Sequence, residues 1–165
     1  MPNHVHLVMA PGEEDGLRAA LGEAHRRYTR HINFREGWRG HLWRERFHSF
    51  AMDEDYLLST VRYVERNPVA ARLCVHPEDW KWSSARTHLK GEDDELVRVK
   101  PMLYRIGRWC DYLSDAAKSD DENLIDLHNR TERPLGCADF VRNLEVITGK
   151  ELASKRPGRK PVIRK

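Results

Sequence analysis

Residues 53–68 read DEDYLLSTVRYVERNP, and this stretch anchors the predicted fold. Asp53 is of a residue type that caps helix N-termini, so we predict a helix that begins there and runs through Arg66. Apolar residues recur along it at spacings of three and four, which is typical of a helix with one face turned to a core. The predicted inward face consists of Leu57, Val61 and Val64.

Two polar residues lie at the end of this helix. Tyr63 and Asn67 are four positions apart, which puts a phenolic oxygen and an amide oxygen on the same helical flank. They are candidates for one shared site. An ordinary interpretation also stands: tyrosine is often half-buried and asparagine often ends helices. Pro68 disfavours a helical conformation at the residue before it, although a short continuation through Val69 to Leu73 is possible.

The first residues of the chain contain a second candidate constellation. The segment from His4 to Met9 is apolar apart from its histidines, and it precedes Pro11, so we predict a buried strand. On a strand, His4 and His6 project from the same face and can offer two neutral nitrogen ligands to one metal ion. In a chain with nine histidines such a pair also arises by chance.

The type of metal follows from the ligands at hand. No further Cys or His lies at the short spacing of a tetrahedral zinc site, and a histidine-triad hydrolase would need a third alternating histidine where Val8 stands. Two imidazoles with one oxygen ligand suit a harder ion that keeps positions open for water and phosphate. The sequence therefore favours Mg²⁺ or Mn²⁺.

Periodicity predicts the remaining elements. A helix is expected from Asp15 to about Asn33, and the aromatic-rich stretch from Leu42 to Met52 is interpreted as a strand or an extended arm. After Gly149 the composition becomes basic and rich in Pro and Gly, which predicts a mobile tail. Three further helices are predicted at Met102–Ala116, Asp121–Arg133 and Ala138–Ile147.

Composition limits the class of protein. The 165 residues suffice for one domain with a tail, the net charge is +3, and 39% of the residues are hydrophobic. No apolar run approaches bilayer length and no secretion signal is evident, so we expect a cytoplasmic protein without a membrane partner. The basic C-terminal residues indicate either a polyanion-binding segment or a merely solvated tail.

Several motifs occur together and in order. They are Met1–Val8 (MPNHVHLV), Tyr28–Asn33 (YTRHIN), Gly40–Phe47 (GHLWRERF), Tyr63–Ala71 (YVERNPVAA), Trp82–Ser84 (WSS) and Gly158–Pro161 (GRKP). Their series resembles the REP-associated tyrosine transposases, a branch of the insertion-sequence-200-like transposases in the His-hydrophobic-His nuclease superfamily. The resemblance covers about half of the chain.

This resemblance implies an α+β fold with an RRM-like or ferredoxin-like core. A partial nuclease core would occupy residues 1–90, a helical extension 91–150 and a disordered basic tail 151–165. Family members have further residues before the histidine segment, so the chain is expected to be N-terminally truncated and to lack the first strands of the core. Carried over residue by residue, His4, His6 and Asn67 would bind Mg²⁺ or Mn²⁺, and Tyr63 would attack the scissile phosphate.

The implied function is cleavage and rejoining of single-stranded DNA hairpins through a 5′-phosphotyrosine, by a nucleoid-associated monomer or homodimer. The alternatives are a catalytically inactive DNA-binding remnant of such a transposase, and a structural helical domain that leaves the paired motifs unexplained. Trp38 and Trp43 are candidate stacking platforms for bases, with core packing as the alternative for both and of equal weight for Trp43. The candidate DNA-binding residues are Arg26, Arg27, Arg30, Arg44, Arg46, Arg159 and Lys160.

Overall fold

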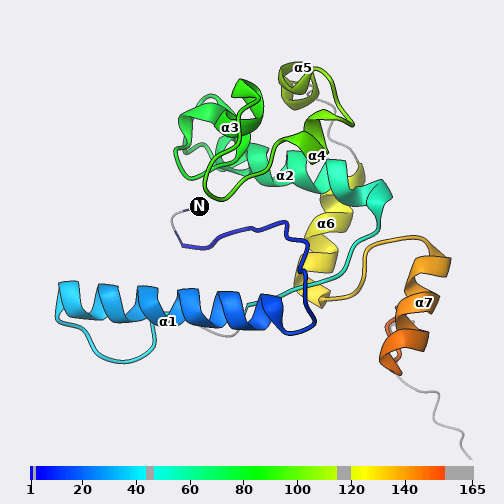
Figure 1. The fold of residues 1–165 in the computed structure, drawn as a ribbon, viewed down its shortest axis with the longest axis horizontal. Helices are drawn as coiled ribbons and strands as arrows, with labels where there is room; N and C mark the ends of the chain where they lie inside the picture. Colours follow the sequence, from blue (N-terminus) through cyan, green and yellow to red (C-terminus); the bar gives the residue numbers. More distant parts are fainter. Residues whose placement is uncertain (2, 44–46, 115–119, 155–165) are drawn as a thin grey trace, which may run out of the picture. The chain divides into compact units, whose positions relative to one another are not determined.

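The computed structural model describes residues 1, 3–43, 47–114 and 120–154. Helices make up 55% of the structure, and the described residues contain no strand or sheet (Figure 1). The predicted α+β ferredoxin-like core is therefore wrong. A single isolated bridge, between Met52 and Leu135, is the extent of the β pairing in these residues.

The predicted strand from His4 to Met9 fails for a physical reason. A strand exists only when its N–H and C=O groups pair with a neighbour, and no described segment runs beside this one in a ladder. Its apolar side chains are accordingly exposed, Val5 by 65% and Leu7 by 57%. The predicted strand or arm from Leu42 to Met52 likewise forms no ladder in its described residues.

The chain divides into two compact units. One unit comprises Met1–His6 and Phe50–Lys165, and the other comprises Leu7–Ser49. Each is described by itself below.

The Leu7–Ser49 unit is built on one long helix. The predicted helix from Asp15 is confirmed as α1, Gly16–Glu36, and Ile32 is its buried residue. Gly37 ends it with φ 66°, a left-handed conformation that glycine adopts without a steric penalty, and its N–H bonds to the Asn33 carbonyl. Beyond that turn, Trp43 stacks on His25 with 4.1 Å between ring centroids.

The larger unit is organised around α2, Leu57–Ala70, which follows a 3-10 turn, η1, at Glu54–Tyr56. Asp53 caps this start as predicted, because its carboxylate accepts the Tyr56 N–H. The helix does not stop before Pro68 but includes it, and Pro68 is buried. The cost is one backbone hydrogen bond, since proline has no N–H to donate.

A small apolar core holds α2 in place. Val61 packs with Ala85, Trp109 and Leu113, and partly buried side chains such as Leu57 surround them. These partners come from α3 (Ala85–Lys90) and α5 (Trp109–Ser114), and the 3-10 turn η2 (Pro77–Asp79) contacts both α2 and α3. The core therefore joins α2 to α3 and α5, which follow it in the chain.

One predicted helix is broken into two. Instead of a continuous helix over Met102–Ala116, the structure has α4 at Lys100–Leu103 and α5 at Trp109–Ser114. Gly107 lies in the connection, and Ile106 there packs against the apolar core, so burial of Ile106 and Trp109 takes precedence over helical continuity.

The last two predicted helices are confirmed. They are α6 (Asp120–Thr131), which packs against α2, and α7 (Ala138–Thr148), which ends at Gly149 with φ 66°. Residues 151–154 of the predicted tail are described, and the backbone N–H groups of Leu152 and Ala153 donate to the Glu145 carboxylate on α7. Arg159 and Lys160 lie outside the described residues. Over the described part of the chain, no helix combines the length and the apolar character needed to span a bilayer.

Candidate functional site

The two histidines of the N-terminal segment lie next to each other although they do not belong to a strand. Their rings meet edge to face, with 4.8 Å between centroids. Nδ1 of His4 donates a hydrogen bond to Oδ1 of Asn3 at 2.8 Å. A ring that donates from Nδ1 keeps the lone pair on Nε2 for another partner, which is how many metal-binding histidines are oriented.

Tyr63 lies beside this pair. The His6 and Tyr63 rings also meet edge to face, with 5.8 Å between centroids. Tyr63 is carried by α2, so the helix brings a residue 57 positions along the chain against the histidine segment. Both belong to the larger unit.

Asn67 and Asp126 complete the surroundings of the phenol. The Asn67 side chain, one turn further along α2, hydrogen-bonds Tyr63 and acts to lower its pKa. The Tyr63 hydroxyl donates to Oδ1 of Asp126, on α6, at 2.5 Å. The structure thus brings together the four residues to which the sequence assigned a catalytic or metal-binding role, and adds Asp126.

Burial is the main reason that the pKa of the Tyr63 phenol is raised well above its usual value, and the Asp126 carboxylate adds to the shift. Both effects penalise the phenolate, one by removing water and the other by placing a negative charge nearby. The phenol is therefore held in its protonated form. A reaction at its oxygen requires a group that takes the proton as the new bond forms.

His6 is shifted in the opposite sense. Burial lowers its pKa below 6.5, the neighbouring His4 lowers it further, and Asp126 partly offsets the effect. The pKa of His4 is also lowered, first by burial. Both rings are thereby favoured in the neutral form, the form that binds a metal ion.

The donor set is compatible with a divalent cation held by His4 and His6. Two adjacent neutral imidazoles, with the Asn67 side chain against the neighbouring phenol, have the chemistry predicted for Mg²⁺ or Mn²⁺. Among the described residues, no group of three or more His, Cys, Asp and Glu side chains is placed to hold a metal ion. Asn67 is an asparagine and so does not count toward such a group of His, Cys, Asp and Glu side chains.

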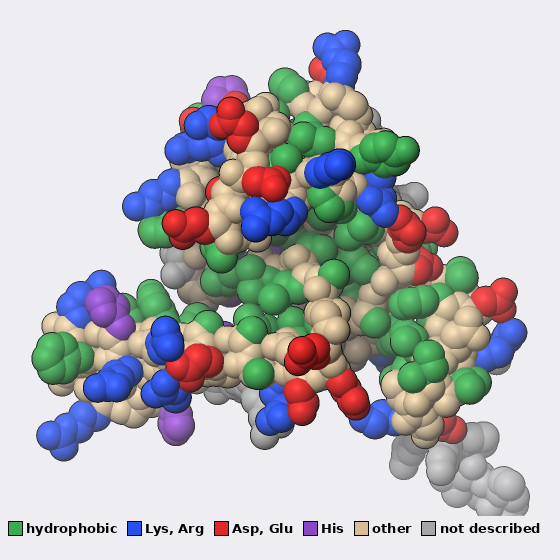
Figure 2. All heavy atoms as spheres, in the orientation of Figure 1, with side chains coloured by type: hydrophobic (Ala, Val, Ile, Leu, Met, Phe, Trp, Pro, Cys, Tyr) green, Lys and Arg blue, Asp and Glu red, His purple; other side chains and the backbone are tan. Residues whose placement is uncertain are grey.

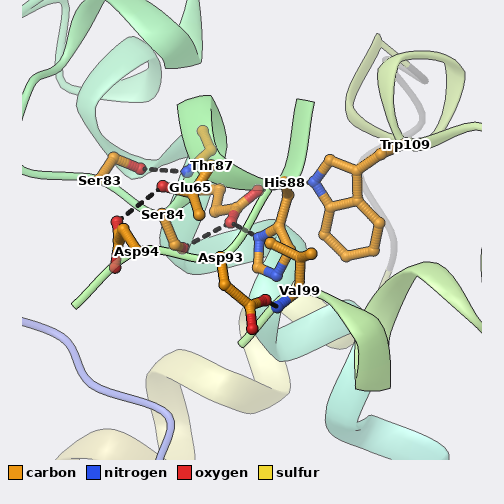
Figure 3. A network of polar contacts seen from close by, with 10 residues as sticks. Glu65, Ser83, Ser84, Thr87, His88, Asp93, Asp94, Val99 and Trp109 are labelled. Carbon is orange, nitrogen blue, oxygen red and sulfur yellow. Dashed lines mark hydrogen bonds and ion pairs between the residues drawn. The ribbon is translucent and has the colours of Figure 1, made fainter. Parts of the chain in front are cut away.

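A buried polar network around Glu65 holds α2, the helix that carries Tyr63 (Figure 3). Glu65 is completely buried, and its Oε1 accepts from the Ser84 hydroxyl at 2.5 Å and lies 2.6 Å from Nδ1 of His88. Its Oε2 accepts from the Trp109 indole N–H at 2.9 Å. One carboxylate therefore joins α2 to the start of α3, to α3 itself and to α5.

The candidate DNA-binding residues belong mostly to the smaller unit. Basic side chains are spread along the surface of α1 (Figure 2). Arg26 and Arg27 both pair with Glu23, at 2.7 Å, whereas Arg30 has no ion pair within the described ranges. Trp38 is 59% exposed, and Trp43 stacks on His25. Arg44 and Arg46, like Arg159 and Lys160, lie outside the described residues.

Comparison of the chain with protein-family models, with curated proteins and with solved structures gave no significant match.

Proposed function

We propose that this protein cleaves and rejoins single-stranded hairpin DNA, with Tyr63 as the nucleophile and a divalent metal ion at His4 and His6. The supporting observation is the contact between His6 and Tyr63, with 5.8 Å between ring centroids, because it links the two motifs that resemble those of the REP-associated tyrosine transposases.

The chain's own residues define the chemistry. The Tyr63 oxygen would attack the scissile phosphorus, form a 5′-phosphotyrosine and release a DNA 3′-hydroxyl. His4, His6 and Asn67 would hold Mg²⁺ or Mn²⁺, which supplies charge stabilisation for a phosphate oxygen when bound. Because the phosphotyrosine stores the bond, a 3′-hydroxyl can reverse the attack and join strands without a nucleotide triphosphate.

The second candidate is DNA binding without cleavage. The observation in its favour is that no described segment forms a ladder with His4–Met9, since a histidine pair on an unpaired segment is held less rigidly than one on a sheet. The basic surface of α1 would serve either function equally.

Cleavage of a single-stranded hairpin oligonucleotide by the 165-residue chain tests the proposal. We expect strand breaks with Mg²⁺ or Mn²⁺ and none with a chelator. His6→Ala should reduce cleavage about 100-fold or more by removing a ligand. His31→Ala is the matched control, an exposed histidine on α1. Hairpin binding without any cleavage would support the second candidate instead.

A further inference from the structure

The carboxylate that contacts the candidate nucleophile comes from a helix to which the sequence assigned no role in the site. Asp126 lies on α6, which packs against α2, and its Oδ1 is 2.5 Å from the Tyr63 hydroxyl oxygen. An ionised carboxylate can only accept, so the phenol is the donor in this bond. That is the geometry that a general base must have toward the proton it removes.

The other groups near the phenol are less suited to the task. The Asn67 amide has no basic atom at ordinary pH. The His6 ring contacts the Tyr63 ring, and in the proposed function His6 is a metal ligand. Glu122 acts on Tyr63 through its charge, with no hydrogen bond to the hydroxyl in the described structure.

Asp126 also lies at an open surface. It lines a hollow of about 530 Å³ together with Asn123, Leu127, Asn129 and Arg130. Positions 123, 126 and 130 are spaced to share one face of α6. Amide groups and a guanidinium are suited to a phosphodiester, so a DNA strand lying in this hollow would bring its backbone to the side of α6 that reaches Tyr63.

We propose that Asp126 is the general base that accepts the Tyr63 proton in strand cleavage and returns it in rejoining. This inference rests on the proposed function. In cleavage, the proton moves from the Tyr63 oxygen to Oδ1 of Asp126 while an electron pair of that oxygen forms the O–P bond. The bond from phosphorus to the DNA 3′-oxygen breaks, and the 3′-oxygen takes a proton from a solvent water, which leaves as hydroxide.

In rejoining, the same atoms work in reverse. A DNA 3′-hydroxyl attacks phosphorus and gives its proton to a solvent hydroxide, and the bond between phosphorus and the Tyr63 oxygen breaks. The protonated Asp126 then donates to the departing phenolate oxygen. One carboxylate therefore serves both directions, which suits an enzyme that must reseal what it cuts.

The test compares adduct formation by Asp126→Asn, Asp126→Ala and Glu122→Gln in single-turnover reactions with a hairpin oligonucleotide and Mn²⁺. Asp126→Asn keeps the size and the acceptor oxygen but not the basicity, so we expect a loss of about 100-fold or more in the adduct rate. Hairpin affinity and Mn²⁺ affinity should stay within about twofold. Added formate should partly restore the rate of Asp126→Ala, and Glu122→Gln should stay close to the unsubstituted chain.

The outcomes separate this inference from the proposed function. If the unsubstituted chain forms no adduct, both fall. If it forms the adduct and Asp126→Asn forms it equally fast, the proposed function stands and Asp126 is not the base. A loss of Mn²⁺ affinity in Asp126→Asn, or a rate of Asp126→Ala that formate leaves unchanged, would likewise overturn the assignment, because Asp126 would then act by holding the site together.

Discussion

The His6 ring lies edge to face against the Tyr63 ring, with 5.8 Å between their centroids. This contact joins the N-terminal segment to α2 within one unit. It also takes part of the His6 surface away from water, and burial is the first reason that the pKa of this imidazole is lowered. The ionisation of His6 therefore reports on whether the site is assembled.

Titration of His6 by NMR in the metal-free chain should give a pKa below 6.5. A lowered pKa means that the unfolded chain binds the proton first as pH falls. The contribution of His6 to stability is therefore fully present above pH 6.5, the ordinary pKa of the unfolded chain. It is lost as the pH falls from there through the lower pKa of the folded state. The urea-unfolded chain is the control. A His6 pKa at or above that of the unfolded chain would contradict the packing described here.

Glu65 should be a major determinant of stability. Glu65→Ala leaves the Ser84 hydroxyl, the His88 ring N–H and the Trp109 indole N–H without their acceptor, in surroundings where Glu65 itself is completely buried. Each unsatisfied buried group costs about 1–3 kcal/mol, so the free energy of unfolding should fall by roughly 3 kcal/mol or more. Urea unfolding measures the change.

Glu92→Ala is the matched control for Glu65→Ala. Glu92 is an exposed glutamate between α3 and α4, and its substitution should change the free energy of unfolding by less than about 0.5 kcal/mol. If Glu65→Ala and Glu92→Ala have the same free energy of unfolding, the Glu65 network does not hold α2 in place.

Helix positions followed from the sequence because their signals are local. The α1 helix was predicted from apolar periodicity, and glycines follow the last residues of α1 and α7 in left-handed conformations. The break between α4 and α5 was missed because it depends on the burial of Ile106 and Trp109 against α2 and α3. No residue spacing within that stretch encodes such packing.

The inward face of α2 was only partly predictable. Val61 is buried as expected, but so are Arg62 and Glu65, which an apolar stripe cannot reveal. The acceptor role of Glu65 depends on Ser84, His88 and Trp109, whose positions along the chain give no sign of convergence. Asp126 was missed for the same reason, since 63 residues separate it from Tyr63.

The failed strand has a different cause. The apolar character of His4–Met9 resembles that of a buried strand, yet strand formation depends on partners that no residue within the segment can supply. The side-by-side arrangement of His4 and His6 does not need the ladder. Residues two apart on any extended backbone can bring their rings together, here to 4.8 Å.

If α1 contacts single-stranded DNA, its arginines should contribute unequally. Hydrogen bonds from Arg26 and then Arg27 lower the pKa of Glu23 to about 2, and the two arginines share this carboxylate as a partner. Arg30→Ala should weaken hairpin binding more than Arg27→Ala. It should also reduce the slope of log affinity against log salt by about 0.7, as expected for one phosphate contact.

Fluorescence anisotropy over a range of salt concentrations measures these slopes. Equal slopes for the unsubstituted chain and Arg30→Ala would exclude a phosphate contact at this position. Affinity that does not change with salt would leave α1 without a role in binding a polyanion.

The most direct measurement is the identification of the residue that carries DNA after the chain reacts with a 3′-labelled hairpin and Mn²⁺. Mass spectrometry of the protease digest should find the 5′-phosphate on the peptide that contains Tyr63. Tyr63→Phe should abolish the adduct while hairpin affinity stays within about twofold, since it removes only the nucleophilic oxygen. An adduct that persists in Tyr63→Phe, for example on Tyr56, would contradict the account.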